Sequence, residues 1–549
     1  MKIHGLHFGN LRGDLYGGVT AAVVALPLAL AFGVSSGAGP IAGLYGAICV
    51  GLFASLFGGT PSQISGPTGP MTVVMTALFT GMTAADPVNG PAMAFTAVML
   101  GGLLQVLMGY LRLGSYVSFV PLPVVSGFMS GIGVIILLLQ LAPLLGQPAI
   151  GRPLDVVDHA GSLVSAAHLP TVVVAILALV IVYGTPRRLG RIVPSPLIAL
   201  LVGTLAVTLL PGLGQVTTLG DIPSGLPAPQ LPTLTLEHLP RILRAAAVLA
   251  LLGSIDTLLT ALVADNLTRT WHDSNRELIG QGVGNIIAGL LGGLPGAGAT
   301  MRTVVNIRAG GLTPISGVVH ALLLLVIVLG LGGAASHIPH AVLAGILIKV
   351  GTDIIDWDYL RRVRRTSRTG VVIMLAVLFT TIFVDLITAV AVGMVMASLV
   401  FLKRHTDLQL GSIRLIDGES GHSALSSDER ALFESAHGRV LLFEFGSAIS
   451  FGAAKALGRM LSQNQRFRVT VLDFTAVPEV DSSAVRVIEE DIRDAKHQGR
   501  FVLLAGMSPR VKRRLRREGV LSLLPPRNRC ADRVTALRRA VELAESPGT

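Results

Sequence analysis

Apolar runs of membrane-spanning length recur along the chain from its start to about residue 404. A helix needs roughly 20 mostly apolar residues to cross the hydrocarbon core of a bilayer, so such runs predict transmembrane helices. The runs that follow Pro67 and Gly298 are too short or too interrupted to cross as one regular helix. About fourteen segments are predicted, at 15–33, 38–57, 68–84, 91–110, 121–144, 170–184, 193–211, 243–265, 278–294, 300–308, 312–332, 339–352, 370–384 and 386–402.

The hydrophobic pattern changes after residue 404. Short segments with the apolar pattern of strands alternate with segments of helical period, which is typical of a small α/β domain. The basic run from Arg510 to Arg517 predicts a further helix. No aromatic residue is interleaved with these arginines to stack on bases, so a solvated or lipid-facing surface is favoured over nucleic-acid contact. The strands are predicted at 438–449, 468–474 and 501–505, and the other helices at 450–463 and 482–498.

The charge distribution supports the same division. Only 14% of the 549 residues are charged, against roughly 25% in soluble proteins. Residues 1–404 hold 35 of these charges, and residues 405–549 hold 40. We therefore predict a transmembrane transport domain over 1–404 and a soluble domain over 405–549. The two cysteines, Cys49 and Cys530, indicate neither a disulfide framework nor a metal cluster.

Basic clusters outside the apolar runs predict the orientation in the membrane. They lie at 187–191, 361–368 and 403–404, and Lys2 and Arg12 lie near the start of the chain. Because cytoplasmic loops are enriched in Lys and Arg, both termini are predicted to be cytoplasmic in a multi-pass inner-membrane protein. The first apolar run is interpreted as a span and not as a cleavable signal. Much of the net charge of +11 therefore marks one membrane face, and no nucleic-acid partner is predicted.

Two distant stretches of the sequence echo each other. The segment 56–61 is matched by 290–295, and the Thr-Val-Val at 72–74 is matched by the one at 303–305, with small residues in between. About seven spans separate the repetitions, and an odd number means that the second half enters the membrane in the opposite direction. Inverted repeats with interrupted helices at matching positions predict a binding site near the membrane midplane.

The interrupted helices also predict the charge of the ligand. Backbone that is not helical is tolerated at membrane depth only where it lines a cavity or is buried in protein. A helix that begins there offers unpaired N–H groups and the positive end of its dipole, which favour an anion. The alternative is that the glycines only let helices pack closely. Two such segments in register favour the binding site.

One carboxylate stands alone in an apolar run. Asp256 lies within 245–263, where a charge costs a few kcal/mol and needs a partner, a proton or a cation. Thr260 lies one helical turn further on the same face, whereas Ser254 and Thr257 are placed on other faces. Together with carbonyl groups freed by a broken helix, these oxygens are suited to Na⁺. Protonation of Asp256, or a hydrogen bond from it to a neighbouring helix, remain the alternatives.

Several other ionisable residues fall in or near the spans. Arg302, just inside the second interrupted helix, is interpreted either as the counter-charge of a bound anion or as the partner of Asp256. Asp14 and Asp385 are interpreted as solvated at the membrane interface, and His320 as a packing histidine with its hydrogen bonds satisfied. The chain has no GxxxxGK[ST] motif, so coupling to an ion gradient is favoured over ATP-driven pumping. No nucleophile motif or cofactor loop indicates an enzyme, and no organic cofactor is predicted.

Several motifs together resemble the SulP anion transporter family. They are Gly17-Gly18-Val19-Thr20 with Leu26-Pro27, Pro67-Thr68-Gly69-Pro70, and Leu294-Pro295-Gly296-Ala297-Gly298-Ala299-Thr300. The tail is similar to the STAS domain that ends most members of the family. Within the family, Gly253-Ser254-Ile255-Asp256 and Glu277-Leu278-Ile279-Gly280-Gln281 resemble the cyanobacterial sodium-dependent bicarbonate transporters. The chain departs from the family pattern at Gly66, where an acidic residue is expected, and at Leu312, where many relatives have Lys.

The resemblance implies a polytopic α-helical membrane protein of about fourteen helices, arranged as two inverted seven-helix repeats that form core and gate domains, followed by a small α/β STAS domain. It implies a homodimer with STAS contact and sodium-coupled symport of bicarbonate, or of another small inorganic anion, by elevator-type alternating access. Carried over by motif, the bicarbonate site consists of Thr68, Ala299 and Thr300, to which we add Arg302. The Na⁺ site consists of Asp256, Thr260 and the Gly298 carbonyl.

Two other functions stay open at this point. The chain could transport sulfate or a small dicarboxylate, either coupled to protons or by exchange. It could also be a membrane-anchored STAS sensor that signals through Ser482, because Asp481-Ser482-Ser483 resembles the phosphoacceptor turn of anti-sigma-factor antagonists. Helix capping by Asp and Ser explains the same three residues without regulation.

Overall fold

The computed structural model of the chain describes residues 3–546 except 118–119, 151, 187–188, 190–192, 214, 221–228, 418–424 and 464–466. The arginines at 187, 188 and 191, which the sequence assigns to a cytoplasmic loop, lie outside the described residues. The chain divides into two compact units, Met1–Val395 and Met396–Thr549. Helix α20 (Leu386–Gly411) contains this division, and the boundary proposed after residue 404 falls further along the same helix.

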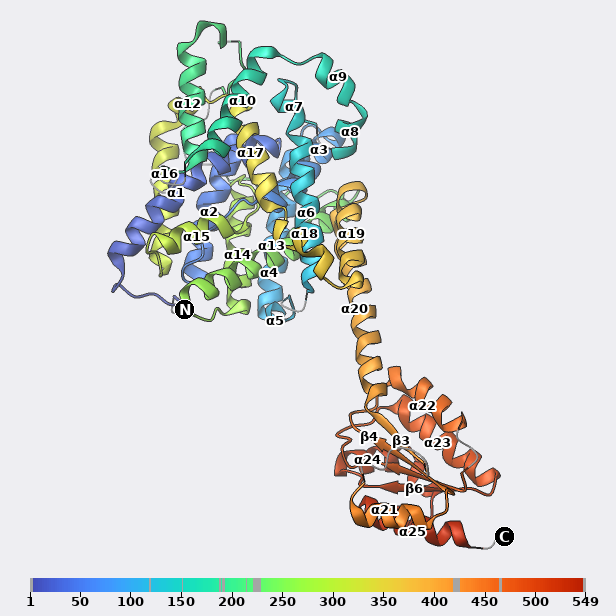
Figure 1. Cartoon of the computed structure of the whole chain (residues 1–549). Helices are drawn as coiled ribbons and strands as arrows, with labels where there is room; N and C mark the ends of the chain where they lie inside the picture. Colours follow the sequence, from blue (N-terminus) through green and yellow to red (C-terminus); the bar gives the residue numbers. More distant parts are fainter. Residues whose placement is uncertain are drawn as a thin grey trace. The chain divides into compact units, whose positions relative to one another are not determined.

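Each of the fourteen predicted spans coincides with an α-helix in the described residues (Figure 1). By length and apolar composition, six helices of the described part can cross a membrane, and five more are apolar but shorter. The fourteen are α1 (Leu11–Ser35), α2 (Pro40–Phe57), α3 (Gly69–Ala85), α4 (Gly90–Tyr110), α6 (Leu122–Leu139), α10 (Leu169–Gly184), α12 (Ser195–Leu209), α13 (Leu239–Thr268), α14 (Ser274–Leu290), α15 (Thr300–Arg308), α16 (Pro314–Ala335), α17 (His340–Ile354), α19 (Arg368–Phe383) and α20.

Short helices connect these spans. They are α5 (Gly114–Val117), α7 (Leu141–Leu144), α8 (Pro153–Asp158), α9 (Ala160–Ser165), η1 (Pro211–Leu213), α18 (Trp357–Arg362) and η2 (Val363–Arg365). Many of the long helices have a proline in their first two positions, for example Pro40 in α2, Pro70 in α3 and Pro314 in α16. Proline fits this position because its fixed φ is helical and the N–H that it lacks would have no intrahelical partner there. These starts are therefore encoded locally.

Helices α4 and α14 pack with their backbones in close contact. A Cβ atom built on Gly102 would lie 2.6 Å from the Gly282 carbonyl oxygen, and one built on Gly282 would lie 2.5 Å from the Gly102 carbonyl oxygen. Only glycine at both positions allows this approach, which is a common solution for helices inside membranes. The contact fixes α14, the helix that leads into the second interrupted segment.

The two interrupted segments meet as a short antiparallel ribbon. Strand β1 (Ser65–Gly66) precedes α3, and strand β2 (Ala297–Gly298) precedes α15. Ser65 pairs with Gly298, and Gly66 pairs with Ala297. Matching segments that run in opposite directions are what an inverted repeat requires. The fold is therefore that of a polytopic helical protein with two inverted repeats, as the sequence predicts.

The second unit is an α/β domain with a four-stranded sheet. Strands β3 (Ile413–Ile416), β4 (Val440–Phe445), β5 (Val469–Asp473) and β6 (Phe501–Ala505) lie in sequence order. β3 is antiparallel to β4, and the other neighbouring strands are parallel. The sequence analysis missed β3, because it is only four residues long and follows directly on α20.

Helices cover both faces of this sheet (Figure 1). One apolar cluster joins the sheet to α22 (Phe451–Gln463), α23 (Ser482–His497) and α24 (Pro509–Arg517). The opposite cluster joins the sheet to α21 (Ser427–Ser435) and α25 (Arg533–Glu545). The helix predicted from the basic run is α24, in which only Val511 and Leu515 are buried. Short 3₁₀ turns at Val520–Leu523 and Pro526–Asn528 complete the unit.

Candidate functional site

The candidate site begins where the two interrupted helices start. Thr68 precedes α3 and Ala299 precedes α15, and neither start has a side-chain cap among the described residues. The first N–H groups of a helix have no intrahelical partner, and the helix dipole adds positive potential there. The β1–β2 ribbon holds the two starts together. Two uncapped helix starts in one place favour a bound anion.

A cavity of about 300 Å³ opens beside these helix starts. Met129 of α6 and Val350 and Asp353 of α17 form the side that faces the interrupted helices. Asp353 is exposed, so the cavity is accessible from the end of α17. Six of the seven residues predicted from the sequence line this cavity: Thr68, Asp256, Gly298, Ala299, Thr300 and Arg302.

The seventh residue, Thr260, lies directly behind the lining and is fully buried. Its Oγ1 donates to the Gly298 carbonyl oxygen at 2.9 Å and lies 2.7 Å from Thr300 Oγ1. Asp256 is buried on the same helix, and its Oδ2 has no hydrogen-bond partner among the described residues. The structure thus brings a carboxylate, a hydroxyl and a carbonyl to one place, a set of hard oxygen donors.

Thr257 lies on a different face of α13 from Asp256, as the helical spacing predicts. Its Oγ1 accepts a hydrogen bond from the Gly298 N–H at 3.0 Å, so this face meets β2. Adjacent residues of a helix are about 100° apart, so Asp256 and Thr257 lie on adjoining faces. β2 contacts this part of α13 through both Thr257 and Thr260. Ser254 does point elsewhere and donates to the Ala250 carbonyl oxygen at 2.6 Å.

The residues predicted to bind the anion differ in whether their hydrogen-bonding groups are free to contact a ligand. Thr68 Oγ1 is buried and has no hydrogen-bond partner in the described part of the chain. Thr300 shares its hydroxyl with Thr260. The Ala299 N–H, in contrast, already donates to the Ile64 carbonyl oxygen at 2.9 Å. Ala299 therefore lines the cavity, but its N–H is engaged within the ribbon.

Arg302 is buried at the back of the cavity. Its Nη2 donates to the Pro67 carbonyl oxygen at 2.5 Å. It makes no direct ion pair with Asp256 within the described structure, but the two opposite charges lie close enough to interact. A Cβ atom at Gly66, where φ is +153°, would lie 2.8 Å from Arg302 Nη1. The backbone conformation and the close guanidinium explain why glycine occupies this position.

A buried carboxylate that the sequence analysis did not assign a role fixes the first interrupted segment. Glu277 Oε2 accepts from the N–H groups of Gly59 and Thr60 at 2.8 and 2.9 Å. Its Oε1 accepts from Gln63 Nε2 at 2.8 Å and from Gln281 Nε2 at 3.1 Å. Gln281 also donates to Ser65 Oγ. Glu277 thereby holds the residues that lead to β1 and the start of α3.

The second interrupted segment has an equivalent support in Asn285. Its Oδ1 accepts from the Gly296 N–H at 2.7 Å, and its Nδ2 donates to the Gly296 carbonyl oxygen at 3.0 Å. Nδ2 also donates to Gln105 Oε1 of α4 at 2.8 Å. A polar side chain that faces the interior of an apolar helix bundle is the signal by which Glu277 and Asn285 could have been found.

Two interpretations of ionisable residues were wrong. Asp14 is completely buried and not solvated at the interface. It accepts from the Leu312 and Thr313 N–H groups and from Thr313 Oγ1 at 2.8 to 2.9 Å, so it holds the residues just before α16, whose N-cap is Thr313. His320 is buried, but both of its ring nitrogens lack hydrogen-bond partners among the described residues. Asp385 is exposed and caps α20 through Thr388.

Ser482 lies in the C-terminal unit at the start of α23. Asp481 caps this helix by accepting from the Ala484 N–H at 2.9 Å, as cap chemistry predicts. The exposed Ser482 hydroxyl donates to Glu518 Oε1 at 3.1 Å and accepts from Arg514 Nη2 at 2.5 Å. Arg510, Arg513 and Arg517 line the adjoining groove together with Arg514.

Residues 11–377 match the sulfate permease family and residues 435–533 match the STAS domain. The chain therefore belongs to the sulfate permease family of membrane anion transporters, with a C-terminal STAS domain. It is 48% identical over 537 residues to the bicarbonate transporter BicA of Synechocystis sp., covering 98% of this chain and 95% of that protein.

Solved structures agree with this assignment. The transmembrane domain of a cyanobacterial bicarbonate transporter BicA is 52% identical, with a TM-score of 0.67, and the match covers 71% of this chain and all of the other. The murine Solute Carrier 26 family member A9 anion transporter in its inward-facing state is only 17% identical, but its TM-score is 0.82 over 97% of this chain and 92% of the other. The latter likeness concerns the fold alone.

Proposed function

We propose that this protein is a sodium-coupled bicarbonate symporter. The observation that carries the proposal is the contact between the two predicted ligand sets, where Thr260 bonds both the Gly298 carbonyl and the Thr300 hydroxyl. The similarity to proteins named bicarbonate transporters over nearly the whole chain supports the choice of anion. A single carboxylate among hydroxyl and carbonyl oxygens fits a monovalent, hard cation.

In this mechanism the cation makes the anion site usable. Na⁺ binds between Asp256, Thr260 and the Gly298 carbonyl, and its charge balances the buried carboxylate. The cavity is then electropositive because Arg302 and the two helix starts are no longer opposed. Bicarbonate binds at the Thr68 and Thr300 hydroxyls and at the first N–H groups of α15, beside Ala299. The loaded helices then move past the gate helices in an elevator-type step.

The proposal extends to the membrane orientation, the oligomeric state and the C-terminal tail. The protein is a multi-pass protein of the inner membrane with both termini cytoplasmic, and it forms a homodimer with STAS contact. Ser482 is a proposed regulatory site, because phosphorylation would place a dianion beside Arg514 and would repel Glu518. Deletion of 405–549 tests both proposals on the tail: full transport and an intact dimer in the truncated protein would contradict a role in either.

The decisive experiment measures labelled bicarbonate uptake into proteoliposomes under an inward Na⁺ gradient. We expect uptake above that of protein-free liposomes, which corrects for diffusion of dissolved CO₂, and little uptake when K⁺ replaces Na⁺. The same rate without Na⁺ would contradict symport, and a preference for sulfate would contradict the substrate. Thr68→Val should raise the bicarbonate KM, whereas Thr68→Ser keeps the hydroxyl and serves as the matched control.

A further inference from the structure

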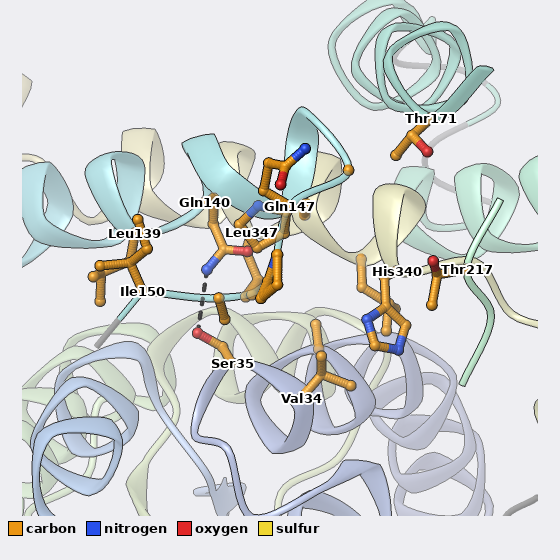
Figure 2. Close-up of a pocket in the computed structure, with 17 residues that line it drawn as sticks. Val34, Ser35, Leu139, Gln140, Gln147, Ile150, Thr171, Thr217, His340 and Leu347 are labelled. Carbon is orange, nitrogen blue, oxygen red and sulfur yellow. Dashed lines mark hydrogen bonds between the residues drawn. The ribbon is translucent and has the colours of Figure 1, made fainter. Parts of the chain in front are cut away.

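A second cavity, of about 340 Å³, lies apart from the candidate site (Figure 2). It is enclosed by the C-terminal end of α1, the junction of α6 and α7, and the first turns of α10 and α17. We call it the outer pocket. Its polar lining consists of uncharged hydrogen-bonding groups and one histidine: Ser35, Gln140, Gln147, Thr171, Thr217 and His340.

The outer pocket and the candidate site follow each other along the same helices. On α1, Ala31 lines the outer pocket and Leu28 lines the site cavity. On α17, Leu347 lines the outer pocket and Val350 lines the site cavity. Residues three apart in a helix are separated by about 5 Å along its axis. About one helical turn therefore separates the two cavities.

The two cavities face each other with apolar, buried lining residues. Phe32, which lines the site cavity, is 4% exposed, and Leu343 and Leu347, which line the outer pocket, are 1% and 2% exposed. A constriction of apolar side chains excludes water and ions without any charged group. The site cavity, in contrast, reaches the exposed Asp353 at the other end of α17. The site is thus closed toward the outer pocket and open on the opposite side.

The predicted orientation places the outer pocket on the extracellular side. The start of α1 and the basic run 361–368 after α17 mark the cytoplasmic face. Ser35 and His340 lie at the opposite ends of these two helices.

One hydrogen bond closes the outer pocket between two groups of helices. Gln140 Nε2 donates to Ser35 Oγ at 3.2 Å, and Figure 2 shows the two side chains directed at each other. Helix α1 packs mainly against α2 and α16 and less extensively against α17, whereas α6 packs mainly against α19 and α17. Movement of α1 and its main neighbours against α6 would therefore break this bond.

We infer that the outer pocket is the closed extracellular vestibule of the transport pathway. The Ser35–Gln140 hydrogen bond is the latch that keeps it shut toward the candidate site. When the latch opens, the vestibule admits a small hydrated anion, which its hydroxyl and amide groups contact weakly before it reaches Thr68 and Thr300. The inference rests on the proposed transport function, of which it specifies the outer path and the closing contact.

Cysteine accessibility in right-side-out vesicles tests the inference. The natural cysteines, Cys49 and Cys530, are buried, and both are replaced by alanine for this purpose. We expect Val34→Cys to react slowly with a membrane-impermeant methanethiosulfonate reagent added outside, and the modification to block bicarbonate uptake. Gln140→Leu, which cannot donate the latch bond, should speed the modification about fivefold, as the loss of one hydrogen bond allows.

Val164→Cys supplies the control, because Val164 is 68% exposed in α9 and does not line the outer pocket. Its modification rate should not respond to Gln140→Leu. Ser35→Ala should add little to Gln140→Leu, since both changes remove the same bond. If Val34→Cys does not fold, Ala31→Cys takes its place in the same lining.

Reaction of Val34→Cys only in inside-out vesicles, or a rate that ignores Gln140→Leu, would overturn the inference. Fully additive effects of Ser35→Ala and Gln140→Leu would equally overturn the latch. Modification does not require the substrate, so these outcomes are separate from the test of the proposed function. The modification rate of Val34→Cys could depend on Gln140→Leu even if the protein shows no sodium-dependent uptake. That result would support the vestibule and contradict the symport proposal.

Discussion

Thr260 Oγ1 lies 2.7 Å from Thr300 Oγ1, so a residue predicted for the cation touches a residue predicted for the anion. The same hydroxyl donates to the Gly298 carbonyl oxygen. Occupation of one proposed site would therefore change the hydrogen bonding at the other. By linkage, an effect of Na⁺ on bicarbonate affinity requires an equal effect of bicarbonate on Na⁺ affinity.

Replacing Thr260 by valine should weaken both ligands together. Valine has the shape of threonine but cannot bond Gly298 or Thr300, so the half-saturating Na⁺ concentration should rise about tenfold. The bicarbonate KM at a fixed Na⁺ concentration should rise as well. Thr260→Ser keeps the hydroxyl and should stay within about twofold of the wild type. An increase in only one of the two constants in the uptake assay would refute the coupling.

Asp256→Asn should abolish the stabilisation of the protein by Na⁺. A ligand at 100 times its Kd adds about 2.7 kcal/mol to the free energy of unfolding. We expect the Tm of the purified wild type to rise when NaCl replaces choline chloride, and that of Asp256→Asn to stay constant. Asp158→Asn is the control, because Asp158 is exposed. A wild type that responds to pH but not to Na⁺ would instead favour proton coupling at Asp256.

Arg302→Lys should separate the anion site from the cation site. Lysine keeps the charge but loses the planar fork, of which one arm holds the Pro67 carbonyl. We expect the bicarbonate KM to rise about tenfold and the half-saturating Na⁺ concentration to change less than threefold, since Arg302 and Asp256 make no direct pair within the described residues. Arg308→Lys, on the same helix but outside the cavity lining, should leave both constants unchanged. A lower Tm with unchanged kinetics would show that Arg302 is structural.

Glu277→Gln should destabilise the transmembrane unit. The carboxylate accepts four hydrogen bonds, and a carboxamide places its own N–H donors against the N–H groups of Gly59 and Thr60 or against those of Gln63 and Gln281. We expect the free energy of unfolding in detergent to fall by about 2 to 4 kcal/mol. Glu237→Gln changes an exposed residue and provides the comparison. Equal stability of the two variants would mean that the loop before α3 does not depend on Glu277.

Asp491→Asn should stabilise the C-terminal domain at neutral pH. Burial raises the pKa of Asp491 to about 6, with Arg500 opposing the rise and Asp494 adding to it. Because the folded state holds this proton more tightly than the unfolded state, Asp491 costs stability as the pH rises to about 6, and the full cost remains above that pH. The variant should gain about 1 to 3 kcal/mol at pH 7.5.

This gain should vanish as the pH falls from 6 to 4, because Asp491 is then protonated in the folded wild type. Hydrogen exchange of the β5 and α23 amides in the full-length protein measures the effect without isolating the domain. The exposed Asp494→Asn should change stability little. A gain that is the same at pH 4 and at pH 7.5 would contradict titration of Asp491 as its cause.

Much of the candidate site could be found in the sequence because its residues are unusual for a transmembrane helix. Asp256 is conspicuous since a carboxylate in an apolar run is costly, and Thr260 follows from helical spacing. The echo of 56–61 at 290–295 indicates the positions of both interrupted helices, although not their pairing. Glu277 and Asn285 are also polar residues in an apolar helix, but their roles depend on which loops they contact, and the sequence does not specify those contacts.

Other features depended on contacts between distant segments. The pattern of Asp14 at a helix edge is equally compatible with solvent and with burial, and only its contact with Leu312 and Thr313 decides between them. The availability of the Ala299 N–H depends on Ile64, which is more than 200 residues away in the chain. The contact of Thr257 with β2 depends on how the ribbon packs against α13, which the helical spacing alone does not specify.

The sequence by itself determined the approximate positions of the fourteen predicted helices, the inverted repeat and the C-terminal α/β tail. Apolar runs, helix-starting prolines and strand alternation are all patterns of residues that lie close together in the chain. Only the tertiary structure decided which polar groups are satisfied and which are left for a ligand. That outcome depends on pairs such as Thr260 with Thr300 and Ser35 with Gln140, which come from different helices and meet only when the two halves of the chain pack together.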